Sequence, residues 1–142
     1  LALGHNRLSI LDLSEDGKQP MHFNNFSIVF NGEIYNYLEL AAEYGLSNLS
    51  GTDTEILLQL WQLQGVSVVA QLDGFFAIAI WDNLEKTLTL VRDRTGVKPI
   101  YYSLNGQGFW FCSEEFALLK AMELVGEKTA ATSEVAFEAV LG

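Results

Sequence analysis

The chain has 142 residues, which suits one domain with one core, and 49% of them are hydrophobic, which excludes a disordered chain. Eight basic residues against 18 acidic ones give a net charge of −10, which argues against nucleic acid and anionic membranes, because both are bound through Lys and Arg. No apolar run approaches the roughly 20 residues of a membrane span, and the single cysteine, Cys112, excludes an intrachain disulfide and favours a reducing compartment such as the cytoplasm.

The first 31 residues are expected to contain two strands. We predict a short strand over residues 1–6, a long loop over 7–23 and a buried strand over 25–31. This second strand ends at Asn31-Gly32, a pair typical of turns because both residues tolerate positive φ. A turn there places a side-chain amide beside a backbone N–H at the edge of a sheet. These two donors could face an oxyanion, the negative charge that develops on a carbonyl oxygen during acyl transfer.

The middle of the chain is predicted to be helical. Residues 38–44 carry helix formers and stop at Gly45, which suits the left-handed position that follows a helix. Residues 52–55, Thr-Asp-Thr-Glu, have the spacing of a capping box, and apolar residues recur at helical spacing after them. A second short helix is expected over residues 66–72.

The second half of the chain is predicted to contain two hairpins and two helices. A continuous apolar run over residues 75–81 indicates a buried strand, and the alternating pattern over 87–92 indicates its hairpin partner. Strands, then helices, then consecutive hairpins predict an α+β sandwich with mostly antiparallel pairing. The remaining predicted elements are a hairpin over 100–103 and 109–113 and helices over 114–122 and 133–141.

Four ordered segments resemble the motifs of one family. Residues 4–10 resemble G-H-x-R-L-S-I, residues 31–36 resemble N-G-E-I-Y-N, and residues 50–55 are similar to S-x-x-D-T-E. Residues 92–102 resemble R-D-R-x-G-x-K-P-L-Y-Y, and the S-E that follows is matched by Ser113-Glu114. The family is the class II glutamine amidotransferase domain of the asparagine synthetase (glutamine-hydrolysing) type, and the resemblance runs from Leu3 to about Leu119.

This resemblance implies both a fold and an activity. The fold is that of the N-terminal-nucleophile hydrolases, an αββα sandwich in which two antiparallel sheets pack between helical layers. The activity is hydrolysis of L-glutamine to glutamate and ammonia, with ammonia passed to a C-terminal synthetase domain of the same parent chain. ATP and Mg are expected in that synthetase domain, and no cofactor or metal in this one. A homodimer of the parent protein is a further possible assembly.

The family's nucleophile is an N-terminal cysteine, which opens a C-G-I segment some dozens of residues before the G-H-x-R-L-S-I motif. Neither that segment nor the synthetase domain is present in the sequence. We therefore expect a truncated chain that is inactive alone. Residues 1–125 are expected to be part of the amidotransferase domain, and residues 126–142 a linker or the start of the synthetase domain.

The resemblance also assigns residues to a glutamine pocket, which needs a cation, an anion and dipoles directed at the amide. Arg7 can bind the α-carboxylate bidentately. Asp53 can pair with the α-ammonium, although the helix macrodipole alone also favours an acid there. Asn31 and Gly32 resemble the family's oxyanion hole, through the Asn amide and the Gly N–H, and Glu33 is expected to line the pocket. The backbone of four further residues is expected beside the substrate: Leu8, Ser9, Ile10 and Leu11.

Other reactive or charged residues are interpreted as structural. Cys112 lies within a predicted strand among aromatic residues and has no His nearby in sequence, so we expect an inert, buried thiol. Arg92, Asp93 and Arg94 are assigned to architecture, as is His5. Two alternatives stay open. One is a glutamine-binding or scaffold module without catalysis, and the other is an amidotransferase that acts on a sugar, a polysaccharide or a peptide.

Overall fold

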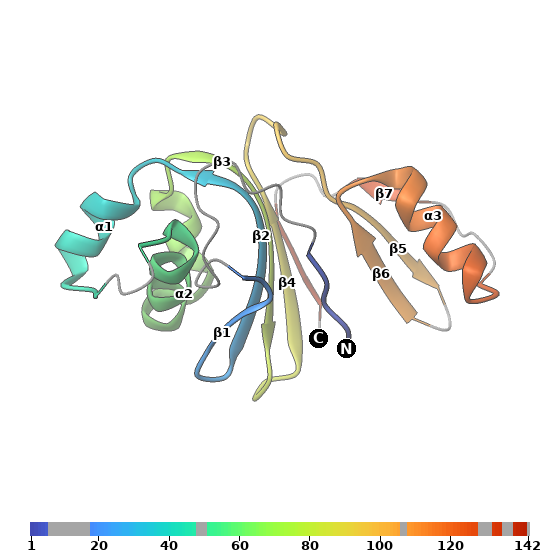
Figure 1. Cartoon of the computed structure of the whole chain (residues 1–142), viewed down its shortest axis with the longest axis horizontal. Helices are drawn as coiled ribbons and strands as arrows, with labels where there is room; N and C mark the ends of the chain where they lie inside the picture. Colours follow the sequence, from blue (N-terminus) through green and yellow to red (C-terminus); the bar gives the residue numbers. More distant parts are fainter. Residues whose placement is uncertain (6–17, 48–50, 106–107, 128–131, 135–137, 142) are drawn as a thin grey trace.

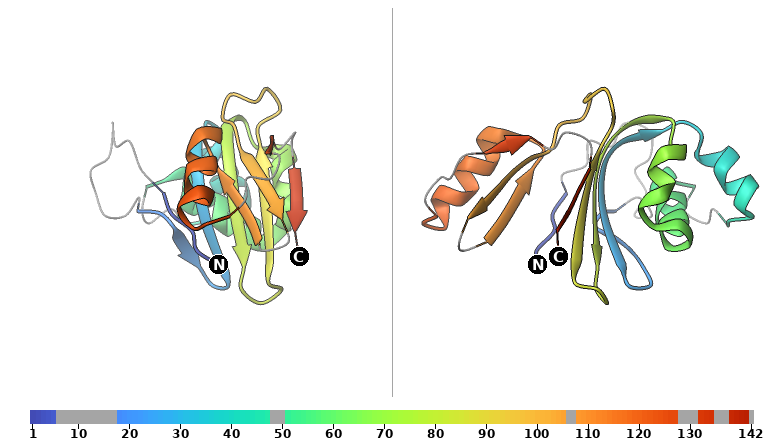
Figure 2. Two further views of the ribbon diagram at one scale, coloured as in Figure 1. Left: turned by 90° about the vertical axis from the view of Figure 1, so that its right-hand side faces the viewer. Right: turned by 180° about the vertical axis from the view of Figure 1, so that it is seen from behind.

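Two antiparallel sheets lie face to face between helical layers in the computed structural model (Figure 1). The larger sheet has the strand order β1-β2-β3-β4-β8, and the smaller one has the order β6-β5-β7. Helices α1 and α2 cover the outer face of the larger sheet, and α3 covers the outer face of the smaller one (Figures 1 and 2). This layering confirms the predicted αββα sandwich. The structure describes residues 1–5, 18–47, 51–105, 108–127, 132–134 and 138–141.

The centre of the larger sheet is the long antiparallel pair β2 (Phe26–Ile34) and β3 (Gly74–Asp82), which pair along their whole length. By contrast, β1 pairs with β2 only as far as Ile28. The edge of β2 after Ile28 is therefore not paired with another described strand. The other strands of this sheet are β1 (Met21–Phe23), β4 (Thr87–Arg92) and β8 (Glu138–Leu141).

The smaller sheet and the helices complete the layers. Its strands are β5 (Tyr101–Asn105), β6 (Gly108–Cys112) and β7 (Ser133–Glu134). The helices are α1 (Tyr37–Tyr44), α2 (Asp53–Gln64), the 3-10 helix η2 (Gly65–Gln71) and α3 (Glu115–Leu124). None of these helices, which are the ones the structure describes, is long and apolar enough to cross a membrane.

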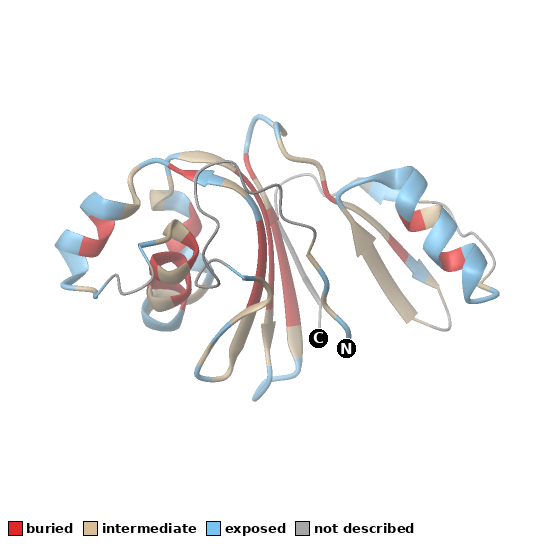
Figure 3. Ribbon diagram, in the orientation of Figure 1, coloured by how far each residue is buried: buried red, intermediate tan, exposed pale blue. Residues whose placement is uncertain are grey.

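Alternation along β2 divides its side chains between two cores. Ile28 and Phe30 face the helices and pack in a cluster with residues of α2, whereas Val29 faces the smaller sheet. Burying a side chain such as Ile28, which is 0% exposed, contributes about 1.5–3 kcal/mol. Buried residues are concentrated in β2, β3, β4 and α2 (Figure 3). On the inner face of β3, the small side chains of Ala77 and Ala79 leave room between the sheets.

Both predicted helix boundaries around α1 and α2 are confirmed. Gly45 follows α1 in the left-handed conformation, with φ 63° and ψ 35°. Thr52 caps α2, because its hydroxyl accepts the backbone N–H of Glu55 at 3.2 Å. This cap fixes Asp53 as the first residue of α2.

The predicted turn at Asn31-Gly32 is wrong. Strand β2 continues through both residues, and Asn31 pairs with Ala77 while Gly32 pairs with Phe76. Gly32 has φ +148°, and a Cβ atom there would collide with the carbonyl oxygen of Phe75. The glycine therefore permits a close approach of two backbones inside the sheet and does not reverse the chain. Consequently, Asn31 lies within a central strand.

The two ends of the chain also differ from prediction. Residues 1–5 form no strand, and the predicted loop over 7–23 ends in β1, which turns back onto β2. Residues 133–141 do not form the predicted helix, because they include strands β7 and β8. There, pairing with the open edges of β5 and β4 outweighs the helix propensity of the Glu and Ala residues. The domain boundary predicted after residue 125 stays a prediction.

Candidate active site

A cavity of about 1020 Å³ lies between the two sheets and contains most of the predicted site residues that the structure describes. Asn31, Gly32 and Asp53 all line it. The opposite wall is formed by Ile100 and by residues 111–114 at the end of β6. The sequence separates these groups widely, and the pairing of β2 with β3 and the packing of α2 bring them together.

The remaining predicted site residues are not part of this described wall. Glu33 is exposed and does not line the cavity, so its place beside a substrate stays a prediction. The others lie outside the described residues: Arg7, Leu8, Ser9, Ile10 and Leu11.

The unpaired edge of β2 forms one side of the site. The side-chain oxygen of Gln19 accepts the N–H of Phe30 at 2.6 Å, and a carboxylate oxygen of Asp53 accepts the N–H of Ile34 at 3.0 Å. Backbone N–H groups alternate in direction along a strand, so the N–H of Gly32 points to this same edge, midway between the two occupied donors. Among the described residues no side chain accepts a hydrogen bond from it. Gly32 is therefore a donor available to a ligand.

Asn31 adds a side-chain amide next to that donor. Its side chain projects from the same face as Val29, toward the smaller sheet, and lies opposite Ala77. Asn31 is exposed and lines the cavity, and its side-chain amide has no hydrogen bond to another described residue. Two N–H donors from adjacent residues thus meet where the strand edge borders the cavity, which is an arrangement suited to a carbonyl oxygen that gains negative charge.

Asp53 provides an anion at the same edge. Burial raises the pKa of its carboxyl group above the ordinary value, and the negative charge of Glu33 adds to this, while hydrogen bonds from Ile34 and Thr54 oppose it. Asp53 makes no salt bridge with a described residue. A partly desolvated carboxylate without a cation attracts one, so a ligand ammonium in the cavity would lower this pKa again.

Asp93 organises the loop that leads from β4 to the cavity. Its side chain is 2% exposed and accepts the backbone N–H groups of Thr95, Val97 and Lys98 at 3.0–3.1 Å, and that of Phe76 at 3.2 Å. Burial raises the pKa of Asp93, but the hydrogen bonds from the backbone of Lys98, Val97 and Phe76 and from the Thr95 hydroxyl outweigh burial and lower the pKa to about 2. The geometry gives Asp93 the structural role predicted for it.

The family model of a glutamine amidotransferase domain matches residues 1–140. The chain belongs to this family. The matched residues include every described residue that lines the cavity and all the segments that carry the motif resemblance.

Relatives and solved structures agree with this assignment. The amidotransferase domain is 41% identical over 140 residues to a putative glutamine-hydrolysing asparagine synthetase of Methanocaldococcus jannaschii, covering 87% of the chain and 27% of that relative. It is 37% identical over 126 residues to asparagine synthetase 1 of Bacillus subtilis, covering 85% of the chain and 20% of that relative. The chain thus spans between about a fifth and somewhat over a quarter of the length of these relatives.

The fold has a solved counterpart. The structure of glutamine phosphoribosylpyrophosphate amidotransferase from B. subtilis matches the domain with a TM-score of 0.65 and 21% identity, over 87% of the chain and 28% of that structure. This likeness confirms the predicted fold of the N-terminal-nucleophile hydrolase type.

Among the cavity-lining residues of the amidotransferase domain that were not predicted for the site are two polar ones, Gln19 and Lys98. Lys98 stands within the R-D-R-x-G-x-K-P motif, which was the available signal, but only Arg92, Asp93 and Arg94 of this motif were interpreted, as architecture. Cys112, interpreted as an inert thiol, is half-buried at the cavity wall. Its thiol has no hydrogen bond to another described residue, so none of the described residues acts as a base on it.

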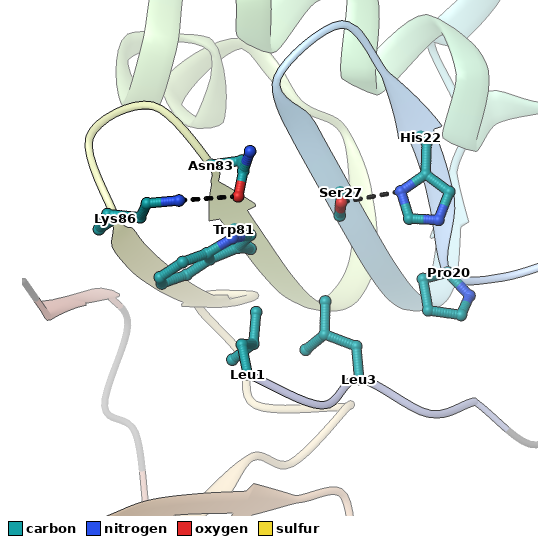
Figure 4. A pocket seen from close by; sticks show the side chains of 8 residues that line it. All are labelled: Leu1, Leu3, Pro20, His22, Ser27, Trp81, Asn83 and Lys86. Carbon is teal, nitrogen blue, oxygen red and sulfur yellow. Dashed lines mark hydrogen bonds between the residues drawn. The ribbon is translucent and has the colours of Figure 1, made fainter.

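A second cavity of the amidotransferase domain, of about 630 Å³, lies at the other end of β2 and β3 (Figure 4). Trp81 forms its floor, and its polar groups are already paired: His22 with Ser27 at 2.8 Å and Lys86 with Asn83 at 3.0 Å. None of the predicted site residues that the structure describes lines it. Among the described residues predicted for the site, Asn31, Gly32 and Asp53 line the cavity between the sheets instead.

Proposed function

We propose that the domain binds L-glutamine in the cavity between the sheets and forms the glutaminase part of an amidotransferase, which hydrolyses glutamine to glutamate and ammonia. The observation that carries this proposal is the pair of available donors at Asn31 and Gly32 in the same cavity as the carboxylate of Asp53, which makes no salt bridge with a described residue. A polar amide group and an ammonium group are the two features of glutamine that such an arrangement recognises.

The geometry suggests how the substrate lies. The carbonyl oxygen of its carboxamide accepts hydrogen bonds from the Asn31 amide and the Gly32 N–H, and its α-ammonium pairs with Asp53. The Asp53 carboxylate accepts the N–H of Ile34, which lies two residues beyond Gly32 along β2. Two residues of an antiparallel strand span roughly 6.8 Å, so this distance separates the Gly32 N–H from the Ile34 N–H along the strand. This separation suits the length of an extended glutamine side chain. The α-carboxylate is assigned to Arg7, as the sequence predicts.

The acceptor of the ammonia is proposed from the names of the relatives. They are glutamine-hydrolysing asparagine synthetases, so we propose that a longer protein with this domain makes an amide from a carboxylate, in a C-terminal synthetase domain that uses ATP and Mg. A cytoplasmic location and a homodimer of that protein belong to the same proposal.

The test is the release of glutamate and ammonia from L-glutamine by a protein that carries this domain. Asn31→Ala is expected to lower kcat by about 10²–10³-fold, with KM nearly unchanged, because an oxyanion donor acts mainly in the transition state. Asn83→Ala, an exposed asparagine beside the second cavity, is the matched control and is expected to behave as wild type. An Asn31→Ala variant with wild-type kcat would overturn the proposed role of this cavity in hydrolysis.

A further inference from the structure

Helix α3 turns large apolar side chains outward, away from the sheet on which it packs. Phe116 is 72% exposed and Leu124 is 86% exposed. Residues three or four apart share one side of a helix, so these two side chains lie in one row with Lys120, and Ala121 lies beside Leu124. All four residues, which we call the α3 face, are exposed. Phe116 and Leu124 are roughly 12 Å apart along the helix axis, about two helical turns.

The two helical layers differ in how much apolar surface they bury. Helix α2 buries six of its side chains, whereas α3 buries only Leu118 and Met122. In addition, α2 has α1 and η2 as neighbours, while α3 is the only described helix over the smaller sheet (Figures 1 and 2). A helix whose apolar side chains point away from its own core, in a layer without a second described helix, offers a surface to a partner.

The charges around the α3 face indicate what kind of partner fits it. Residues 114–127 contain one basic residue, Lys120, and it is already paired with a carboxylate of Glu123 at 2.6 Å. The same segment contains four acidic residues: Glu114, Glu115, Glu123 and Glu127. A second copy of this acidic face would therefore be repelled, whereas a helix with lysines or arginines beside its apolar side chains would be attracted.

We propose that the α3 face binds a cationic amphipathic helix that belongs to the same, longer protein. The matched region makes up 27% and 20% of the two asparagine synthetase relatives, so a protein of similar length has most of its chain outside this domain. The apolar side chains of the partner helix pack on Phe116, Ala121 and Leu124, and its basic side chains meet the surrounding glutamates. This inference goes beyond the proposed function, because no residue of the α3 face lines the cavity between the sheets.

The chemistry of the partner is tested by NMR titration of the chain with a synthetic helical peptide, which carries leucines at i, i+3, i+4 and i+7 and lysines on both flanks. Saturable shifts are expected along α3. Phe116→Ser combined with Leu124→Ser should weaken binding by about tenfold or more, because two buried apolar contacts are lost. Leu38→Ser combined with Leu63→Ser is the matched control. It removes leucines of α1 and α2 that are 57% and 60% exposed, and it should bind as wild type.

A second peptide isolates the contribution of charge. It has glutamates in place of the lysines, and we expect it not to bind. Raising the salt concentration from about 0.05 M to about 0.5 M should weaken the binding of the lysine peptide several-fold, because salt screens exposed charges. Equal binding of the two peptides, or wild-type binding of the lysine peptide by the Phe116→Ser, Leu124→Ser variant, overturns the proposal.

The origin of the helix is tested by thiol labelling with a maleimide. Phe116→Cys and Leu84→Cys place thiols at positions that are 72% and 73% exposed in this chain, and the wild-type chain measures the background reaction of Cys112. In a longer protein that carries the domain, Phe116→Cys should react about tenfold more slowly than in the chain alone, since it reacts only when the helix has left. Leu84→Cys should react equally in both.

Two results of these measurements would identify a different occupant. Equal labelling of Phe116→Cys in the chain and in the longer protein overturns the proposal that the helix belongs to the same protein. A wild-type chain that sediments as a dimer, and becomes a monomer on Phe116→Ser, shows that a second copy covers the α3 face and overturns the proposal as well.

Discussion

The carboxylate of Asp53 accepts the backbone N–H of Ile34 at 3.0 Å, which joins the first residue of α2 to the unpaired edge of β2. This hydrogen bond holds the carboxylate of a helix residue at the edge of the cavity between the sheets. It also explains two properties of Asp53 together. The hydrogen bond fixes the orientation of the carboxylate, and the partial burial that comes with it raises the pKa.

Asp53→Asn is expected to weaken ligand binding without lowering the stability of the fold. The amide oxygen of asparagine can still accept the N–H of Ile34, while the cost of burying a charge disappears. We therefore expect the melting temperature at pH 7 to be equal to or above that of wild type. Affinity for L-glutamine should fall by roughly 10- to 150-fold, which corresponds to the 1.5–3 kcal/mol of a charge-assisted hydrogen bond.

The pH dependence of this comparison has a definite sign. Because the folded-state pKa of Asp53 lies above its ordinary value of 3.8, ionisation disfavours the folded state at neutral pH. The stability difference between Asp53→Asn and wild type should therefore shrink as the pH falls through the raised pKa toward 3.8. Thermal melts between pH 7 and pH 3 measure this. A difference that grows on acidification would contradict the assignment.

The ionised Asp93 should stabilise the fold, whereas the ionised Asp53 destabilises it, because the pKa of Asp93 is lowered. Its pKa is lowered from the ordinary value of 3.8 to about 2, so its contribution is complete above about pH 4 and is lost as the pH falls toward 2. The shift corresponds to about 2 kcal/mol at 1.36 kcal/mol for each pKa unit. Asp93→Asn is expected to lower the free energy of unfolding at pH 7 by at least this amount and to remove that part of the acid dependence.

Asp73→Asn is the matched control for Asp93, because Asp73 is exposed and its side chain makes no hydrogen bond to a described residue. Urea unfolding of both variants at pH 7 and pH 3 makes the comparison. If Asp93→Asn unfolded at the same urea concentration as Asp73→Asn, the loop before Lys98 would not depend on this carboxylate.

Gly32→Ala is expected to destabilise the fold more than Gly45→Ala. Both glycines have positive φ, +148° at Gly32 and +63° at Gly45. A Cβ at Gly45 meets no atom within 4 Å, so only the left-handed backbone conformation is penalised, by about 1–2 kcal/mol. A Cβ at Gly32 would additionally collide with the Phe75 backbone. Equal unfolding free energies for the two variants would show that β2 and β3 can separate locally at no cost.

Much of the fold could be predicted because local signals and tertiary structure agree there. The apolar alternation of β2 and β4, the cap at Thr52 and the stop at Gly45 each have one local interpretation, and the structure confirms them. Residues 133–141 were misread because helix formers there pair with sheet edges that only the complete fold provides. Gly32 was misread because a glycine at a turn and a glycine at a close backbone approach leave the same signal in a sequence.

Residues of the candidate site could be predicted only where they belong to a motif that the family shares. Asn31, Gly32 and Asp53 came from the family resemblance, and the cavity brings them together. Gln19 and Lys98 could not be placed, since each reaches the cavity through a contact distant in sequence. Gln19 depends on its bond to the Phe30 N–H, and Lys98 depends on the loop that Asp93 organises.

The central claim is that Asn31, Gly32 and Asp53 surround one amino acid, and NMR titration of the isotope-labelled chain with L-glutamine tests it most directly. The predicted result is a saturable shift of the Gly32 and Ile34 backbone N–H signals and of the Asn31 side-chain amide, while the indole signal of Trp81 in the second cavity stays in place. Saturable shifts confined to Trp81 and its neighbours, or none at all at Gly32 and Asn31, would contradict it.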